Sequence, residues 1–436
     1  MKPKSKSILF LALAIGMAGF FNTRAENISK SQNLTDISES EKIIGGYLPY
    51  YRMNKVNSEI FDYLTHVYYF AVGPSANGEL GKTDPFQGFL TVDKISYVSR
   101  DIDTLRAWRG TKPVKIFLVV GGWELSDFFD EAAADPTSRA NLVSNIKNFC
   151  LEHQIDGVDL DWEAYNGPVD ETNYGLLVSE LREAFNGTEL QISATVNPKY
   201  YNLANKLTGV DFLQIMSYGS YFDGNTQVSI SQLEEWTNGW NDNGWDKSKL
   251  VIGLPAFAKT PDDNSALIYN ELIGFFTLDE QTDLVQHDGK MYYFNNIETV
   301  NQKTQFMMNQ DLGGVMIWEI GQDVSPSQTK SLVRNIHETL HTTLSSEEIS
   351  LDKSPFKLYP NPASEKICLE FDINEPSEIK AFITNISGQV VWRNDEYRLA
   401  GKHKIFINIS EFSNGYYLLN WFNGNDKMQG SFIKTK

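Results

Sequence analysis

The chain has 436 residues, and at roughly 100–200 residues per domain this length predicts two domains, one of them large. Hydrophobic residues make up 41% of the sequence and charged residues 22%, a globular composition that excludes an extended disordered chain. The formal net charge is −18, so the chain repels phosphate backbones and anionic lipid, and we expect no nucleic-acid partner.

The first 25 residues have the order of regions found in a secretory signal peptide. Three lysines precede an apolar run over residues 8–21, and small residues around Arg24 provide a cleavage site after Ala25. This run is shorter than the roughly 20 residues that a membrane-spanning helix needs. We therefore expect residues 1–25 to be removed on export and the mature chain to have no membrane span, although a membrane anchor is the alternative.

Eight short apolar runs follow, with helix-like stretches such as 138–153 and 171–185 between them. The runs read IIGGYL from Ile43, THVYYFAV from Thr65, VKIFLVVGG from Val114, DGVDLDWE from Asp156, ELQISATV from Glu189, DFLQIMSY from Asp211, KLVIGLPAF from Lys249 and GGVMIWEI from Gly313. Near-continuous apolar runs are typical of parallel strands that are covered on both faces. Their alternation with helices predicts an α/β fold, a closed (β/α)8 TIM barrel over residues 42–341.

From residue 342 the sequence changes character. Residues 342–354 are polar and predict a linker, and short alternating runs separated by turn signals follow within 355–436. This pattern predicts a small C-terminal antiparallel β-sandwich. Cys150 and Cys368 fall in different predicted domains, so we expect two buried free thiols instead of a disulfide.

The most informative segment is the fourth run. Asp159, Asp161 and Glu163 alternate with Leu160 and Trp162, so in a strand the three acids point to the same side, about 6.6 Å apart. Buried acids this close must share protons, and their coupling raises the pKa of the outermost acid so that it can donate a proton near neutral pH. A surface row of acids or a divalent-metal site is the alternative, but the apolar surroundings favour a catalytic group.

At this segment the chain resembles the family 18 glycoside hydrolases, the chitinases and their relatives, whose fourth barrel strand carries DGxDxDWE. Further matches lie at six other strands: Gly46-Tyr47, Phe70-Ala71, Gly121-Gly122-Trp123, Met216-Ser217-Tyr218, Gly253-Leu254-Pro255 and Gly313-Gly314-Val315-Met316-Ile317-Trp318. The resemblance covers residues 43–341. It implies a retaining mechanism in which the 2-acetamido group of the substrate is the nucleophile.

The resemblance also implies a role for each site residue. Glu163 would protonate the glycosidic oxygen, and Asp161 would orient the acetamido group and stabilise the oxazolinium ion. Asp159 would share a proton with Asp161, and Tyr218 would donate its hydroxyl to the acetamido oxygen. Substrate-binding residues would be Trp318 under the sugar (plain barrel core being the alternative), Tyr47, Phe70, Gly122, Trp123 and Met216. No metal or organic cofactor is implied, and we expect a monomer.

Two residues depart from the family pattern, and one connection is shorter than in the processive chitinases. Gly219 stands where many chitinases have an aspartate that touches the sugar, and Val119 stands where a serine is usual. The stretch between the last two predicted strands, 259–312, is short for an α+β insertion that walls the groove. We therefore expect a shallower, more open cleft with altered substrate contacts.

The C-terminal segment resembles the sorting domain of the Bacteroidetes type IX secretion system. The matching residues are Leu358-Tyr359-Pro360-Asn361-Pro362-Ala363-Ser364, Ile386-Ser387-Gly388 and Asn414-Gly415-Tyr416-Tyr417-Leu418. The resemblance implies the type IX machinery as a partner, with export through the periplasm to the medium or the cell surface. A sugar-binding β-sandwich using Trp392 and Trp421 is the alternative.

Together these patterns predict a secreted chitinase that hydrolyses β-1,4 bonds between N-acetylglucosamine units in chitin or related oligosaccharides. One alternative is an endo-β-N-acetylglucosaminidase that acts on N-glycans, although such enzymes commonly lack the tryptophan found here as Trp162. Another alternative is a non-catalytic chitin-binding lectin, although such proteins have usually lost the acid, and Glu163 is present.

Overall fold

The computed structural model describes residues 42–163, 167–219, 227–276, 282–346, 356–373, 375–385, 390–423 and 426–436. The predicted signal peptide and residues 347–354 of the predicted linker lie outside this described part. The chain divides into two compact units, Met1–Thr339 and Leu340–Lys436.

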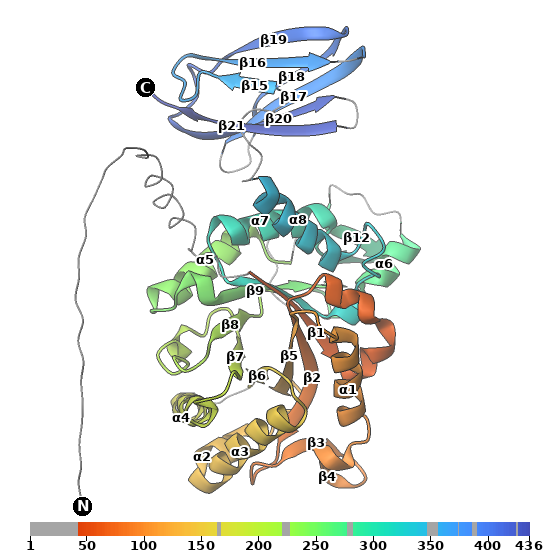
Figure 1. The fold of residues 1–436 in the computed structure, drawn as a ribbon, viewed down its shortest axis with the longest axis vertical. Helices are drawn as coiled ribbons and strands as arrows, with labels where there is room; N and C mark the ends of the chain where they lie inside the picture. The colour runs from red at the N-terminus through yellow and green to blue at the C-terminus, as the bar shows by residue number, and fades with distance from the viewer. Residues whose placement is uncertain are drawn as a thin grey trace, which may run out of the picture. The chain divides into compact units, whose positions relative to one another are not determined.

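The first unit contains a closed barrel of eight parallel strands (Figure 1). In barrel order the strands are β1 (Ile43–Pro49), β2 (His66–Pro74), β5 (Lys115–Gly121), β6 (Gly157–Asp161), β7 (Gln191–Val196), β8 (Phe212–Ile215), β9 (Leu250–Pro255) and β14 (Gly314–Trp318). β1 pairs with β2 and with β14, which closes the sheet. Each strand overlaps one of the predicted runs, so the predicted (β/α)8 barrel is confirmed.

Helices connect most of these strands. They are α1 (Val98–Arg109), α2 (Phe129–Ala134), α3 (Pro136–Glu152), α4 (Pro168–Phe185), α5 (Ile230–Asp242), α6 (Tyr269–Phe275), α7 (Ile297–Asn309) and α8 (Leu332–Ser346). α3 begins at Pro136 because the carboxylate of Asp135 accepts hydrogen bonds from the N–H groups of Thr137 and Ser138. None of the helices in the described part is long and apolar enough to cross a membrane.

Short 3-10 helices also occur between and after the strands. These are η1 (Tyr50–Lys55), η2 (Ser58–Asp62), η3 (Val92–Lys94), η4 (Tyr201–Leu203), η5 (Lys247–Lys249) and η6 (Ile320–Gln322). The β1–β2 connection contains only η1 and η2, and the β7–β8 connection contains only η4. The barrel therefore lacks an α-helix at two of its connections, a detail that the strand pattern did not predict.

Two small antiparallel additions surround the carboxyl ends of the barrel strands. A hairpin of β3 (Leu80–Asp84) and β4 (Gly88–Thr91) extends β2. Between β9 and β14, β10 (Phe257–Lys259), β11 (Ala266–Ile268), β12 (Leu284–His287) and β13 (Lys290–Tyr293) form a separate sheet beside α6. The 259–312 stretch therefore contains a small α+β insertion, and the predicted shallow cleft stays a prediction.

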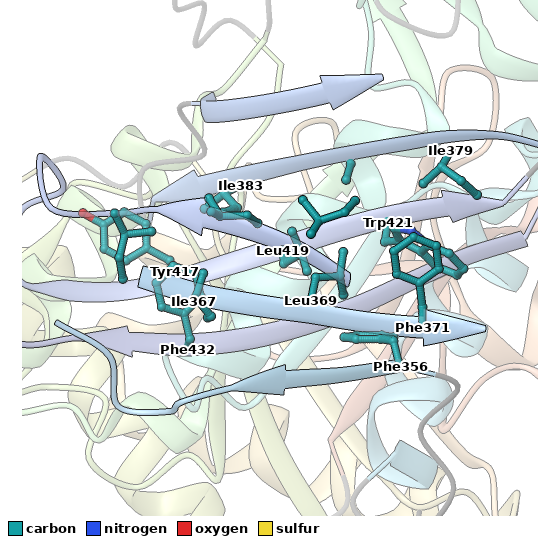
Figure 2. Close-up of a cluster of buried hydrophobic side chains, with 14 of the residues drawn as sticks. Phe356, Ile367, Leu369, Phe371, Ile379, Ile383, Tyr417, Leu419, Trp421 and Phe432 are labelled. Atoms are coloured by element: carbon teal, nitrogen blue, oxygen red, sulfur yellow. The ribbon is translucent and has the colours of Figure 1, made fainter. Parts of the chain in front are cut away.

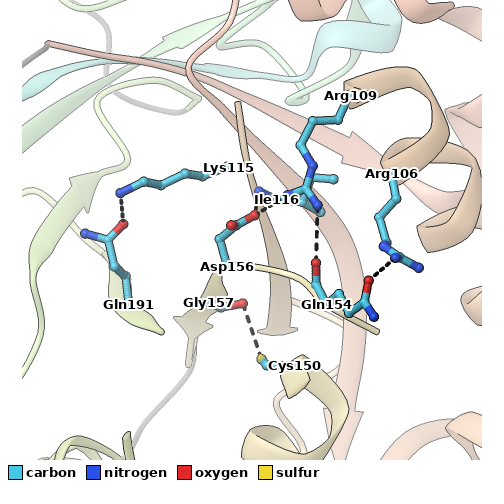
Figure 3. A network of polar contacts seen from close by, with 9 residues as sticks. All are labelled: Arg106, Arg109, Lys115, Ile116, Cys150, Gln154, Asp156, Gly157 and Gln191. Carbon is cyan, nitrogen blue, oxygen red and sulfur yellow. Dashed lines mark hydrogen bonds and ion pairs between the residues drawn. The ribbon is translucent and has the colours of Figure 1, made fainter. Parts of the chain in front are cut away.

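A polar network fixes the start of β6 at the end of the barrel opposite the strand carboxyl ends (Figure 3). Asp156, just before β6, accepts hydrogen bonds from Arg109 at 2.6 Å and from the Ile116 N–H at 2.8 Å. Lys115 donates to Gln191 at 2.6 Å and ties β5 to β7. Because side chains alternate along a strand, this anchor also sets the direction in which the acids of β6 point.

The second unit consists of two antiparallel sheets around one apolar core (Figure 2). One sheet contains β15 (Phe356–Tyr359), β16 (Lys366–Ile373) and β19 (Gly401–Asn408), and the other contains β17 (Ser377–Asn385), β18 (Val390–Arg398), β20 (Gly415–Asn423) and β21 (Asp426–Lys434). Both sheets contribute core residues, among them Leu369, Phe371, Ile383 and Leu419. The predicted β-sandwich is confirmed, while its predicted turn at residues 386–388 lies outside the described residues.

The structure also tests the predictions for the two tryptophans of the sandwich, the two cysteines and the linker. Trp421 is 1% exposed within the sandwich core, so it presents no ring to a sugar, and the alternative of a binding site on this tryptophan is wrong. Trp392 packs against the same core. Cys150 and Cys368 are both free and buried, as predicted. α8 continues to Ser346, so the first residues of the predicted linker have a helical backbone.

Candidate active site

A cavity of about 1250 Å³ lies where the barrel strands end. Seven of the predicted site residues line it: Asp161, Glu163, Tyr218, Trp318, Trp123, Met216 and Phe70. The other three, Asp159, Tyr47 and Gly122, are buried behind this lining. The structure therefore brings together residues from β2, β6 and β14 and from the loops after β5 and β8.

Asp159 is fully buried inside the barrel. Its carboxylate accepts hydrogen bonds from Ser193 Oγ at 2.6 Å, Tyr47 OH at 2.8 Å, Thr195 Oγ1 at 2.9 Å and Gln214 Nε2 at 3.0 Å. Burial raises the pKa of Asp159, and these hydrogen bonds act in the opposite direction. These four donors also fix the orientation of the Asp159 carboxylate beside Asp161, the next acid on β6.

Asp161 ends β6 and lines the cavity, although it is only 3% exposed. Its Oδ1 atom has no hydrogen-bond partner among the described residues. Burial, followed by the charges of Glu163 and Asp159, raises the pKa of Asp161 well above its usual range. A buried carboxylate oxygen with unused capacity beside a cavity can accept a hydrogen bond from the N–H group of a ligand.

Glu163 is held at the cavity through its backbone. Its N–H donates to the Asp161 carbonyl at 3.1 Å and to Ser126 Oγ at 3.1 Å, and Ser126 donates to the Gly122 carbonyl at 2.9 Å. Burial raises the pKa of the Glu163 carboxyl, and a hydrogen bond from the Trp123 backbone opposes this rise. A carboxyl with a raised pKa keeps its proton closer to neutral pH, as a proton donor requires.

Two glycines after β5 allow the close packing of this turn. Gly121 has a φ of +114°, and a Cβ there would lie 2.1 Å from the carbonyl oxygen of Asp161. Gly122 has a φ of +96°, and a Cβ there would lie 2.3 Å from the Phe70 ring. Gly122 therefore supports the site by packing, whereas its neighbour Trp123 is 74% exposed and lines the cavity.

Aromatic rings form the floor of the cavity. Trp318 meets Phe70 edge-on with ring centroids 4.7 Å apart, and its ring centroid lies 5.5 Å from that of Tyr47. Tyr47 is 1% exposed and supports this floor from inside the barrel. Trp318 and Phe70 are half-buried and line the cavity, so their outer atoms can contact the apolar face of a sugar ring.

Tyr218 lies in the loop after β8. Burial raises the pKa of its hydroxyl well above the usual value, and the charges of Asp161 and Glu163 add to this rise. The hydroxyl therefore stays protonated and can act as a hydrogen-bond donor. The next residue, Gly219, has a φ of +90°, and no described atom lies within 4 Å of the position of a Cβ there.

Gln227 joins this loop to the insertion. Its fully buried amide accepts a hydrogen bond from the Gly219 N–H at 3.2 Å and donates to the carbonyls of Phe257 at 3.1 Å and Tyr293 at 2.9 Å. Phe257 lines the cavity and packs edge-on against Tyr218, with ring centroids 6.3 Å apart. The position of Tyr218 is thus coupled to β10 and β13.

Sequence reasoning missed the donors around Asp159. Ser193, Thr195 and Gln214 stand within otherwise apolar runs, and this interruption was a usable signal. Val119 is fully buried and pairs with Asp159 in the sheet register, so an apolar side chain stands beside this acid where the family pattern has a serine. Ser193, Thr195 and Gln214 of β7 and β8 supply hydrogen bonds to Asp159 instead. Other missed cavity residues come from loops and small additions without a clear pattern: Tyr50, Tyr51, Lys82, Phe89, Asn197, Phe257 and Lys259.

The described residues contain no group of three or more histidine, cysteine, aspartate or glutamate side chains arranged to hold a metal ion. Of the acids at the cavity, Asp161 and Glu163 both have raised pKa values, because burial disfavours their charged forms and the charge of Glu163 adds to the rise at Asp161.

Residues 43–323, more than half of the chain, match the family model described as glycosyl hydrolases family 18. The chain belongs to this family. Residues 357–435 match the model described as a secretion system C-terminal sorting domain, which indicates that this family 18 hydrolase is exported.

Similar proteins include chitinases from other organisms. The chain is 22% identical to Endochitinase 1 of Metarhizium robertsii over 274 residues, which cover 49% of this chain and 63% of that protein. It is 25% identical to Chitinase A1 of Niallia circulans over 303 residues, which cover 52% of this chain and 43% of that protein. The chain thus spans about half the length of these curated relatives.

A solved structure shares the barrel fold. The crystal structure of a chitinase from Bacteroides thetaiotaomicron superposes with a TM-score of 0.60 at 23% sequence identity, covering 72% of this chain and 99% of that chain.

Proposed function

We propose that this family 18 hydrolase is a chitinase that cleaves β-1,4 bonds between N-acetylglucosamine units by substrate-assisted retaining catalysis. The observation that supports this most is the buried Asp161 carboxylate. Its Oδ1 atom has no hydrogen-bond partner among the described residues, and Asp161 lines the cavity together with Glu163 and Tyr218. This arrangement suits a substrate that brings an N–H group and a carbonyl of its own.

Glu163 acts as the proton donor. Its protonated carboxyl transfers a proton to the glycosidic oxygen as the bond from that oxygen to the anomeric carbon breaks. The acetamido oxygen of the sugar attacks the anomeric carbon and forms an oxazolinium ion. Glu163, now ionised, takes a proton from water, which opens this ion and returns the sugar with its original configuration.

Asp161 and Tyr218 hold the acetamido group during these steps. Asp161 Oδ1 accepts the acetamido N–H and stabilises the positive charge that develops, while the Tyr218 hydroxyl donates to the acetamido oxygen. Asp159 shares a proton with Asp161 and thereby reduces the negative charge on Asp161. Trp318 and Phe70 contact the sugar from below, and Trp123 and Met216 contact it from the cavity walls.

The test compares four substrates with the purified chain: chitin oligomers, fully deacetylated glucosamine oligomers, cellulose oligomers and a high-mannose glycopeptide. Products are identified by mass and their anomeric configuration by NMR. Cleavage of chitin oligomers alone, with retention and with inhibition by a thiazoline mimic of the oxazolinium ion, is expected. Rapid cleavage of cellulose oligomers, or a sugar ester trapped on Asp161, would overturn the mechanism. Preferred cleavage of the glycopeptide would overturn the substrate.

We also propose a route by which the chain leaves the cell. A signal peptide over residues 1–25 would lead it to the periplasm, and the type IX machinery would recognise the sandwich and carry the chain out as a monomer. The match of residues 357–435 to a sorting domain supports this path.

A further inference from the structure

Lys82 is a cation in the active-site cavity that the mechanism above does not use. It lies on β3, in the hairpin that extends β2 beyond the barrel. The neighbouring Gly81 pairs with Gly73, which follows Phe70 on β2. Lys82 therefore reaches the cavity from the hairpin, whereas Phe70 and Trp318 reach it from barrel strands.

Tyr50 holds the ammonium group of Lys82, and Tyr97 supports Tyr50. Its Nζ atom donates to the hydroxyl of Tyr50 at 2.6 Å and lies 4.5 Å from the centre of the Tyr50 ring. Tyr50 in turn stacks on Tyr97, with ring centroids 4.7 Å apart and an interplanar angle of 14°. Because a hydrogen bond and a cation–π contact act on the same group, the charge is fixed at the cavity wall.

The charge of Lys82 is not balanced locally. Within the described part of the chain Lys82 makes no ion pair, and its hydrogen bond to Tyr50 uses one of three N–H donors. The acids of the cavity come from elsewhere: Asp161 and Glu163 from the end of β6, and Glu124 and Asp127 from the loop after β5. In a chain with a net charge of −18, an ammonium group held in the cleft without a carboxylate is a specific feature.

We propose that Lys82 makes the cavity select acetylated over deacetylated sugar units at a subsite away from the cleavage point. The hydroxyl and acetamido oxygens of N-acetylglucosamine can accept its hydrogen bonds, whereas the protonated amine of glucosamine carries a like charge. The inference rests on the proposed function. The cleaved sugar must be acetylated to supply the nucleophile, and Lys82 extends this requirement to a sugar that takes no part in the chemistry.

The test uses the full chain and partially deacetylated chitin oligomers in mildly acidic buffer, where the glucosamine amine is protonated. Products are sequenced by mass spectrometry to identify each sugar relative to the cut. The unmodified chain is expected to favour acetylated units about fivefold to tenfold at one subsite besides the cleaved sugar. This preference should shrink as salt is added, because ions screen the repulsion.

Three variants change the charge of Lys82 or the side chain that holds it, and a fourth is the matched control. Lys82→Gln removes the charge and should abolish the preference at that subsite, while Lys82→Arg keeps the charge and should retain it. Tyr50→Phe keeps the ring but loses the hydroxyl that fixes the ammonium group, and it should weaken the preference. Lys94→Gln, at an exposed position outside the cavity lining, changes the net charge equally and should leave the preference intact.

Two results would overturn the inference in distinguishable ways. If the unmodified chain cuts fully acetylated oligomers, and folded Lys82→Gln gives the same sugar pattern as the unmodified chain, the role of Lys82 is wrong and the proposed function stands. If the unmodified chain does not cut fully acetylated oligomers, the proposed function fails and the inference fails with it.

Discussion

The hydroxyl of Tyr47 donates a hydrogen bond of 2.8 Å to Oδ2 of Asp159, although the two residues are 112 positions apart in the sequence. β1 and β6 are not neighbours in the sheet, so this bond crosses the interior of the barrel. The protonation of the buried acid therefore depends on a side chain that does not line the cavity.

Tyr47→Phe should change the pH dependence of the enzyme. Loss of a hydrogen bond to the ionised form raises the pKa of Asp159, so the acidic limb of the kcat/KM profile should move to higher pH. Unfolding in denaturant should show a loss of about 1 kcal/mol. Tyr68→Phe is a matched control, because the buried Tyr68 hydroxyl has no described hydrogen-bond partner. An equal shift in both variants would contradict the role of the bond.

Glu163→Gln should keep the fold and the binding of sugar but remove the proton that the reaction needs. We expect kcat on chitin oligomers to fall about 10²- to 10⁴-fold, with a smaller change in the affinity for oligomers measured by calorimetry. An unchanged melting temperature would show that the loss is chemical. Hydrolysis at a near-normal rate would mean that another group donates the proton.

Glu319 should make the stability of the barrel depend on pH. It follows Trp318, is 1% exposed, and lies 3.1 Å from Arg52 Nε. Burial raises the pKa of Glu319 to about 7, although Arg52 opposes this rise. Because the folded state binds this proton more tightly than the unfolded state, the stabilisation is complete below about pH 4 and is lost as pH rises through 7.

The size of this effect can be measured by denaturant unfolding across that range. Glu319 should contribute a fall of up to about 3 kcal/mol in the unfolding free energy between about pH 4 and pH 8. Glu319→Gln cannot titrate, so its stability should vary less with pH. A pH dependence identical to that of the unmodified chain would show that Glu319 does not titrate in this range.

Removal of residues 355–436 should leave an active barrel, because the two units have separate cores. In the native host the truncated chain should accumulate in the periplasm, as determined by cell fractionation and chitin-oligomer assay of each fraction. The full-length chain is the control and should reach the medium or the cell surface. Normal export of the truncated chain would contradict a sorting role for the sandwich.

The sequence predicted those parts of the molecule that depend on periodic patterns. Continuous apolar runs indicated each barrel strand, and the alternation of Asp159, Asp161 and Glu163 indicated a row of acids on one side of β6. The structure adds why that row is tolerated. Asp159 is hydrogen-bonded by Ser193 and other donors, whereas Asp161 keeps one oxygen free among the described residues.

Features that depend on contacts between distant segments could not be predicted in this way. The β3–β4 hairpin is short and half exposed, so it lacks the apolar run that marks a strand, and it carries Lys82 into the cavity. Trp421 illustrates the converse error, because a tryptophan in an alternating strand can face either the core or the solvent. Only the register of β17 with β20 places it inside.

The three hydrogen bonds of Gln227 have a consequence for how such enzymes diversify. One buried amide connects the loop after β8, which carries Tyr218 and Gly219, to two strands of the insertion. The insertion is therefore not an independent module that recombination could exchange without loss. A grafted insertion must present two carbonyl groups to this amide, or the tyrosine loses its support, so loop and insertion should be inherited together.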